Sequence, residues 1–297
     1  MNAVALQPQA PHYSRSLREL LRGLVDESLL AQVPDKVVQG LSMDSRRQAA
    51  NSAFIAVPGL QGHGLDYAAQ AVSNGANVVL WEPQAGRTAA LTNVQCVAVP
   101  QLHTLLGALA DRFYAQPSAA LRIAAVTGTN GKSTTAYLLA EAAEACALTA
   151  GYSGTVGYGR IDALRTATHT TPDVISVHRQ LAEMRDAGAQ VVGMEVSSHA
   201  LHQSRIDSVN IDTAVFTNLS RDHLDYHGSM LAYGEAKAAL FNVPSLRHRV
   251  VNADDAFGRE LLTRSSTAQM TTLSAPRPIA AMPRFLRRVC CRRRACC

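Results

Sequence analysis

A glycine-rich loop that runs into lysine and serine is the part of this sequence with the clearest chemistry. The loop reads Gly128-Thr129-Asn130-Gly131-Lys132-Ser133-Thr134 and follows an apolar stretch from Leu121 to Val126. Backbone N–H groups in such a loop attract phosphate oxygens, as does the N-terminus of the helix that follows. Lys132 can reach terminal phosphates and Ser133 can hold Mg²⁺. The common phosphate-loop pattern would need glycine in place of Val126, so a chance turn is the alternative.

Three more polar residues, which lie at or after predicted strands or within a predicted helix, are candidates for the same site. Glu195 lies near the end of the strand expected over Gln190–Val196, and a carboxylate at that edge of a parallel sheet can ligate Mg²⁺. A solvated strand-end acid is the alternative reading. Imidazole is an unusual Mg²⁺ ligand, so His223, considered alone, is expected to be a loop histidine that makes hydrogen bonds. Lys237 lies within the helix expected over Tyr233–Phe241. Considered alone, it is expected to be exposed to solvent.

Three segments together resemble the motifs of the Mur ligases. They are the loop, Met194–Leu201 and Phe216–Gly228, and the resemblance runs from about residue 17 to about residue 273. It implies an ATP-dependent amide ligase of peptidoglycan precursor synthesis. Such an enzyme adds the third residue, meso-diaminopimelate or L-lysine, to UDP-MurNAc-L-Ala-D-Glu. The loop also resembles that of the folylpolyglutamate synthases, but the segment Asp44-Ser45-Arg46 favours the Mur ligases.

The resemblance also implies a mechanism and a set of site residues. The substrate carboxylate attacks the γ-phosphate of ATP, and an amine then displaces phosphate from the acyl phosphate. The implied catalytic residues are Lys132, Glu195, His223 and Lys237, and the implied ATP-binding residues are 128 to 134. The implied Mg²⁺ ligands are Ser133, Glu195, His223 and Lys237, the last if it is carbamylated, with Asp222 and Asp225 close by. The implied substrate-binding residues are Met43, Ser45, Leu60, Gln61, Gly62, Thr170, Thr171, Ser197, Gln203 and Arg205. Each of these could instead form a turn or cap.

Alternating apolar strands and amphipathic helices predict an α/β fold with two domains. Residues 17–117 are expected to form a small Rossmann-like domain that binds the UDP-substrate. Residues 118–273 are expected to form part of a phosphate-loop ATP-binding domain. The expected strands include Ala53–Val57, Val78–Trp81, Val94–Val99 and Thr213–Phe216, and the expected helices include Leu65–Gly75, Leu102–Tyr114 and Val174–Ala187. The third, amine-binding domain of the family has no counterpart here. Little or no turnover is therefore expected, and a binding-only protein is an alternative.

Composition and charge limit the class of protein, its compartment and its partners. Of the 297 residues 47% are hydrophobic and 17% charged, no apolar run reaches a membrane-spanning length, and no secretory signal is evident. These features predict a cytoplasmic monomer without a membrane or nucleic-acid partner. Seven of the 28 basic residues are arginines after residue 274, where no acidic residue occurs. The positive net charge of +5 therefore comes from this end of the chain.

The two ends of the chain are expected to differ from the two domains. Residues 1–16 are expected to be flexible. Residues 274–297 lie outside the resemblance, hold four of the six cysteines and have no helix or strand period. These features predict a disordered tail, which either is translated from a shifted reading frame or is natural. They do not favour a zinc site. The other two cysteines, Cys96 and Cys146, fit reduced thiols.

Overall fold

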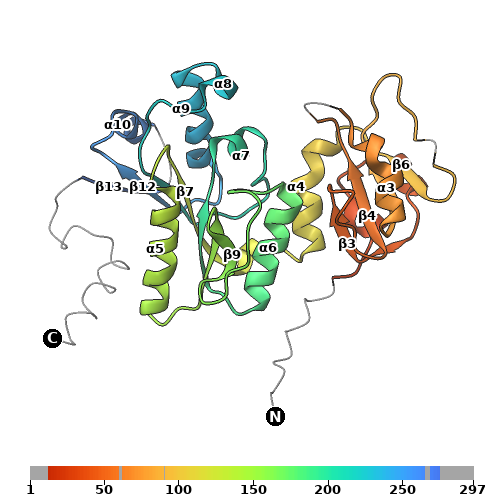
Figure 1. Cartoon of the computed structure of the whole chain (residues 1–297), viewed down its shortest axis with the longest axis horizontal. Coiled ribbons are helices and arrows are strands. Elements are labelled where there is room, and N and C mark those ends of the chain that lie inside the picture. Colours follow the sequence, from red (N-terminus) through yellow and green to blue (C-terminus); the bar gives the residue numbers. More distant parts are fainter. Residues whose placement is uncertain (1–12, 60–61, 90, 265–267, 275–297) are drawn as a thin grey trace, which may run out of the picture. The chain divides into compact units, whose positions relative to one another are not determined.

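A computed structural model describes residues 13–59, 62–89, 91–264 and 268–274 of this chain. The chain divides into two compact units, Met1–Ala115 and Gln116–Cys297 (Figure 1). The predictions made for residues 1–12 and for the tail from residue 275 lie outside the described residues. Within the described ranges, the helices are too short or too polar to cross a membrane.

The first unit contains a four-stranded parallel sheet. Its strand order is β3 (Gly40–Ser42), β4 (Ser52–Ala56), β5 (Ala76–Trp81) and β6 (Gln95–Ala98). All five residues of β4 are buried, as expected of a strand inside a parallel sheet. The accompanying helices are α1 (Leu17–Leu21), α2 (Glu27–Gln32), α3 (Ala68–Ser73) and α4 (Leu102–Phe113). The expected helix over Leu65–Gly75 is only partly right, since it begins as a 3₁₀ turn, η1 (Gly64–Tyr67).

The N-terminal segment of the first unit differs from the prediction. Arg15–Ser16 form the short strand β1, which pairs with β2 (Val37–Val38) in an antiparallel ladder. The ring of Tyr13 packs against Phe113 and Tyr114. The end of the segment 1–16, expected to be flexible, is therefore ordered by backbone pairing and aromatic packing.

The second unit is built on a seven-stranded sheet. The strand order is β13 (Gln269–Leu273), β12 (His248–Asn252), β11 (Thr213–Phe216), β7 (Arg122–Thr127), β10 (Val191–Glu195), β8 (Ala150–Gly154) and β9 (Gly157–Arg160). All neighbours are parallel except the β8–β9 pair. The chain places β8 and β10 on one side of β7 and β11 to β13 on the other. The carboxyl end of β7 is therefore the switch point at which open α/β sheets bind ligands.

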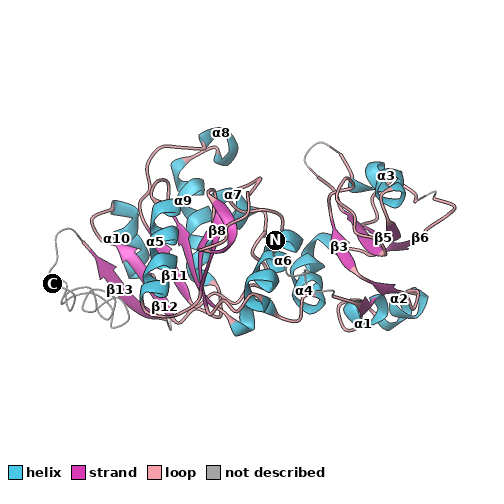
Figure 2. Cartoon of the chain, turned by 60° about the horizontal axis from the view of Figure 1, so that its bottom comes forward, coloured by secondary structure: helices cyan, strands magenta, loops and turns pink. Residues whose placement is uncertain are grey.

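Helices cover both faces of this sheet (Figure 2). The buried alanines of α5 (Lys132–Ala145) pack on one face. Side chains of α6 (Val174–Asp186), α9 (Met230–Ala238) and α10 (Ala256–Thr263) pack on the other. The shorter helices are α7 (Ser198–His202), α8 (Leu224–His227), η2 (Pro117–Ala120) and η3 (Ala239–Asn242). The α/β class predicted from the sequence is confirmed.

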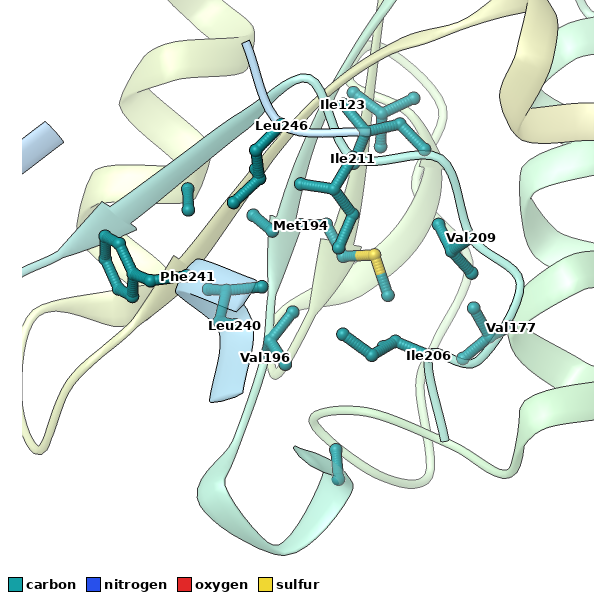
Figure 3. Close-up of a cluster of buried hydrophobic side chains, with 14 of the residues drawn as sticks. Ile123, Val177, Met194, Val196, Ile206, Val209, Ile211, Leu240, Phe241 and Leu246 are labelled. Carbon is teal, nitrogen blue, oxygen red and sulfur yellow. The ribbon is translucent and has the colours of Figure 1, made fainter. Parts of the chain in front are cut away.

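The larger core cluster holds the strands in place (Figure 3). Ile123 of β7 and Met194 of β10 pack there with Val177 of α6, and Leu240 and Phe241 of η3 join them. Each such fully buried apolar side chain contributes about 1.5–3 kcal/mol to folding. This packing fixes the strands whose carboxyl ends carry the polar residues of the site.

Candidate functional site

The glycine loop joins β7 to α5 at the carboxyl edge of the sheet. Gly128 has φ +148°, and a Cβ at this position would overlap Thr217 Oγ1. Gly131, which precedes the first residue of α5, has φ +82°. L side chains rarely adopt such backbone conformations, so both positions favour glycine. The loop directs the unsatisfied N–H groups of the first turn of α5 towards the sheet edge, where a phosphate would be attracted.

The segment after β11 holds the loop in this shape. Thr129 N donates to Asn218 O at 2.8 Å, and Asn130 N donates to the side-chain oxygen of Asn218 at 3.1 Å. Ser220 N donates to Thr129 Oγ1 at 3.0 Å, and the buried Tyr233 hydroxyl donates to the same atom at 3.2 Å. The structure therefore joins the loop to the Phe216–Gly228 motif and to α9.

Two lysines share one carbonyl of the loop. Lys132 Nζ donates to Gly128 O at 3.0 Å and to Thr129 O at 2.9 Å, and Lys237 Nζ donates to Gly128 O at 2.8 Å. Lys237 is only 1% exposed, so the expectation of an exposed helix lysine is wrong. Its Nζ lies 4.3 Å from the centroid of the Tyr233 ring. Burial, then the charge of Lys132, lowers the pKa of Lys237 to about 7.

Glu195 ends β10 beside the loop, and its carboxylate is surrounded by donors. Ser133 Oγ donates to Oε2 at 2.8 Å, and the Tyr152 hydroxyl donates to Oε1. Thr155 donates twice, from its backbone N to Oε1 at 2.8 Å and from Oγ1 to Oε2 at 3.3 Å. A Cβ on Gly154 would overlap both Glu195 Oε1 and the Tyr152 hydroxyl oxygen, so this packing requires glycine there.

Sequence reasoning missed Tyr152 and Thr155. Both belong to β8 and the turn after it, a segment Ala-Gly-Tyr-Ser-Gly-Thr whose small residues gave no strand signal. Burial, then its bond to Glu195, raises the pKa of the Tyr152 hydroxyl. The hydroxyl therefore keeps its proton and remains a donor.

The predicted histidine lies on the same edge. His223 precedes α8 with a left-handed backbone, φ +51°. Its ring lies 4.8 Å from that of His199 and 6.0 Å from that of Tyr233, measured between centroids. Its Nε2 is 3.5 Å from a carboxylate oxygen of Asp222, and its side chain is 46% exposed. A ligand at the sheet edge can therefore reach it.

The donor set fits Mg²⁺ better than a transition metal. Among the described residues, no three or more His, Cys, Asp or Glu side chains converge closely enough to hold a metal ion. The hydroxyl of Ser133 and the carboxylate of Glu195 do meet at 2.8 Å. Mg²⁺ prefers oxygen, keeps several waters and binds through one or two carboxylates together with substrate phosphates. The arrangement therefore fits Mg²⁺ carried by a nucleotide.

The structure brings together the five substrate-binding residues predicted in the second unit. Arg205 donates from Nη1 to Thr171 O at 2.7 Å, and its Nε and Nη2 donate to Gln203 Oε1 at 3.0 and 2.6 Å. Thr171 Oγ1 donates to Glu195 O at 2.9 Å. Ser197 N donates to Thr171 Oγ1 at 3.3 Å, and the Ser197 hydroxyl also caps α7. Thr170 Oγ1 lies 2.9 Å from Thr155 Oγ1.

The predicted residues of the first unit are only partly described. Ser45 is buried, and its hydroxyl donates to Gln70 Oε1 at 2.6 Å. Gly62 O accepts from Gly59 N at 2.7 Å. Met43 lies after β3 and is partly buried. Leu60 and Gln61 lie outside the described residues.

Two family models match this chain. The one described as the Mur ligase middle domain matches residues 126–279. The one described as the Mur ligase family, catalytic domain, matches residues 37–114. One match therefore lies within each of the two units.

Relatives of known name match over most of this chain. The UDP-N-acetylmuramoyl-L-alanyl-D-glutamate--2,6-diaminopimelate ligase of Xanthomonas campestris pv. campestris is 51% identical over 232 residues, 78% of this chain and 47% of the relative. The protein of the same name from Alkalilimnicola ehrlichii is 47% identical over 253 residues, 82% of this chain and 50% of the relative. The chain therefore spans about half the length of the relatives it matches.

Comparison with solved structures agrees with the family matches. A structure of UDP-N-acetylmuramoyl-L-alanyl-D-glutamate--2,6-diaminopimelate ligase is 33% identical with a TM-score of 0.73, and the match covers 89% of this chain and 53% of that one. MurF from Acinetobacter baumannii is 21% identical with a TM-score of 0.62, covering 88% of this chain and 54% of MurF, a likeness of fold alone.

Proposed function

This chain belongs to the Mur ligase family, and we propose that it carries out the ATP-dependent part of amide ligation to UDP-MurNAc-L-Ala-D-Glu in peptidoglycan precursor synthesis. The observation that supports the proposal is the convergence of three groups at one sheet edge. They are the phosphate loop, Glu195, and the polar group that includes Thr170 and Arg205. The names of the relatives favour 2,6-diaminopimelate over L-lysine as the added amino acid.

The residues of the loop would bind ATP. The N–H groups at the start of α5 would hold phosphate oxygens, and Lys132 would exchange its bonds to Gly128 O and Thr129 O for bonds to the terminal phosphates. Ser133 and Glu195 would hold Mg²⁺ together with these phosphates. When bound, the ion would neutralise phosphate charge and lessen the repulsion of an incoming carboxylate.

The polar group around Arg205 would hold the muramoyl peptide. Gln203 and Thr171 already fix the guanidinium of Arg205, so little side-chain freedom would be lost on binding an anionic group. In the reaction a carboxylate oxygen of the substrate forms a bond to the γ-phosphorus, and the bond from this phosphorus to the oxygen of ADP breaks. A neutral amine nitrogen then attacks the acyl carbon and loses a proton, and phosphate leaves with its bonding electrons. Fixed cationic donors favour the first step, because they offset the repulsion between the two anions.

Lys237 would react with CO₂ to form a carbamate. This reaction needs a neutral amine, which attacks the carbon of CO₂ and releases a proton. The burial of Lys237 and its pKa of about 7 make the neutral amine available near neutral pH. The resulting carbamate would supply another oxygen ligand for Mg²⁺.

The first unit would bind the uridine end of the substrate. The proposed residues there are Met43, Ser45 and the loop 60–62. The support is the burial of Ser45 and its bond to Gln70, which fix the turn after β3.

Phosphate release tests the proposed function. The chain is incubated with ATP, Mg²⁺ and UDP-MurNAc-L-Ala-D-Glu, with either 2,6-diaminopimelate or L-lysine, and the product is followed by mass spectrometry. We expect phosphate release that requires the UDP-substrate, with any ligated product formed from 2,6-diaminopimelate. Binding of both ligands without phosphate release would contradict the ligase proposal and favour a binding-only protein.

A further inference from the structure

Thr155 connects the proposed metal carboxylate to the proposed substrate loop. It lies in the turn between β8 and β9, and its side chain is exposed. Its Oγ1 is 3.3 Å from Glu195 Oε2 and 2.9 Å from Thr170 Oγ1. Its backbone N also donates to Glu195 Oε1, which fixes the residue beside the carboxylate. One hydroxyl therefore contacts both groups.

The two bonds of Thr155 Oγ1 can form at the same time in only one arrangement of the hydroxyl hydrogens. A hydroxyl has one hydrogen and can accept two, whereas a carboxylate only accepts. With both bonds formed, Thr155 donates its single hydrogen to Glu195 Oε2. In the bond between the two threonines Thr170 is then the donor, so its only hydrogen points at Thr155 rather than at a ligand.

The carboxylate of Glu195 has no further acceptor site to offer. Its two oxygens provide about four lone-pair sites. Four donors fill them: the Tyr152 hydroxyl and Thr155 N on Oε1, and the hydroxyls of Ser133 and Thr155 on Oε2. The backbone N–H and the buried tyrosine are fixed, but the two hydroxyls can rotate. A cation held at Oε2 would therefore displace a hydroxyl hydrogen, and the bond from Thr155, at 3.3 Å, is longer than the bond from Ser133, at 2.8 Å.

We propose that Thr155 is a positioning residue that couples the binding of Mg²⁺-nucleotide to the binding of the muramoyl peptide. This inference rests on the proposed function, which assigns Glu195 to the metal and Thr170 to the substrate. With Mg²⁺ held by Glu195, the hydrogen of Thr155 would turn to Thr170. The hydrogen of Thr170 is then free for an anionic group of the substrate. The coupling is reciprocal, so each ligand raises the affinity for the other.

Calorimetric titration of the full chain with UDP-MurNAc-L-Ala-D-Glu tests the coupling. The titration is done without nucleotide, with ADP and EDTA, and with ADP and Mg²⁺. For the unmodified chain we expect about a tenfold gain in affinity only with ADP and Mg²⁺, the size of one charge-assisted hydrogen bond. In Thr155→Val, which keeps the shape but lacks the hydroxyl, the gain should fall below about twofold. Thr155→Ser should restore it.

Thr155→Val also has a signature that a merely structural role would not produce. Without nucleotide it should bind the UDP-substrate at least as tightly as the unmodified chain, because the hydrogen of Thr170 is already free. The matched control is Thr213→Val, at the opposite edge of the sheet, whose hydroxyl donates to Asp212 at 3.1 Å. That variant should keep the tenfold gain.

The outcomes separate this inference from the proposed function. A chain that binds both ligands without coupling, or a Thr155→Val variant that keeps the full gain with an unchanged melting temperature, overturns the role of Thr155 alone. A chain that binds neither ligand overturns the proposed function and this inference with it. Loss of the gain in Thr213→Val as well would show that the effect is not specific to Thr155, and would also overturn it.

Discussion

The substitution Glu195→Gln separates a metal-binding carboxylate from a structural one. The four donors around the carboxylate decide how glutamine must lie. Thr155 N can only donate, so the amide oxygen must take the place of Oε1. The amide NH₂ then takes the place of Oε2, where the hydroxyls of Ser133 and Thr155 can rotate to accept. The variant therefore keeps its hydrogen bonds but presents N–H where a cation would need an oxygen.

The expected magnitudes follow from this geometry. Replacing charge-assisted bonds by neutral ones should cost about 1 kcal/mol of folding free energy, or about 2–4 °C in melting temperature for a unit of this size. Losing the anionic ligand should cost about 2–3 kcal/mol in Mg²⁺-dependent nucleotide binding, roughly 30- to 150-fold. Binding without Mg²⁺ should stay within about threefold, since the phosphate loop is untouched.

Calorimetry with ADP measures both quantities. The titrations are done with Mg²⁺ and with EDTA, on the unmodified chain, on Glu195→Gln and on Glu183→Gln. The last is a control on the same unit, where Glu183 pairs with the exposed Arg165 at 2.9 Å. If Glu195→Gln weakens binding equally with and without Mg²⁺, Glu195 is structural and its metal role is refuted.

Three further substitutions test the loop and its lysines. Lys132→Ala should weaken nucleotide binding by about 2–4 kcal/mol but leave the melting temperature unchanged, because Asn218 still holds the loop; unchanged affinity would contradict the loop's assignment. The pKa of Lys237 is lowered to about 7 in the folded chain from its ordinary value of 10.5, so between these values the unfolded state binds more protons and stability should rise with pH. In CO₂-free buffer, urea unfolding at pH 7, 8.5 and 10 should show this rise in the unmodified chain but not in Lys237→Met, and equal slopes would count against the lowered pKa. Gly128→Ala should lower the melting temperature and abolish nucleotide binding, since its Cβ would overlap Thr217; normal binding by this variant would show that the loop adapts.

The sequence correctly predicted the elements and residues whose pattern lies within one short segment of the chain. The apolar run before Gly128 and the lysine–serine step predicted β7, the loop and α5, because all three lie within one short segment. The strand that ends at Glu195 was readable for the same reason. The Mur ligase resemblance is confirmed by the family matches over residues 37–114 and 126–279.

What sequence could not predict depends on contacts between distant segments. The burial of Lys237 arises from the glycine loop and from Tyr233, which only the fold brings over it. Tyr152 and Thr155 approach Glu195 only because β8 pairs with β10, a parallel pairing that no short segment encodes. The roles assigned to the individual site residues remain predictions until they are tested by substitution.

We propose that this chain uses ATP to activate the carboxylate of UDP-MurNAc-L-Ala-D-Glu. Trapping with hydroxylamine tests it most directly, because hydroxylamine attacks an acyl phosphate and no amino acid is needed. The chain, ATP, Mg²⁺, UDP-MurNAc-L-Ala-D-Glu and hydroxylamine are incubated together, and the hydroxamate of the UDP-substrate is measured by mass spectrometry. We expect hydroxamate that requires ATP, Mg²⁺ and the UDP-substrate and that falls by at least about tenfold in Lys132→Ala. Absence of hydroxamate from a folded chain that binds both ligands, or equal amounts from Lys132→Ala, would contradict it.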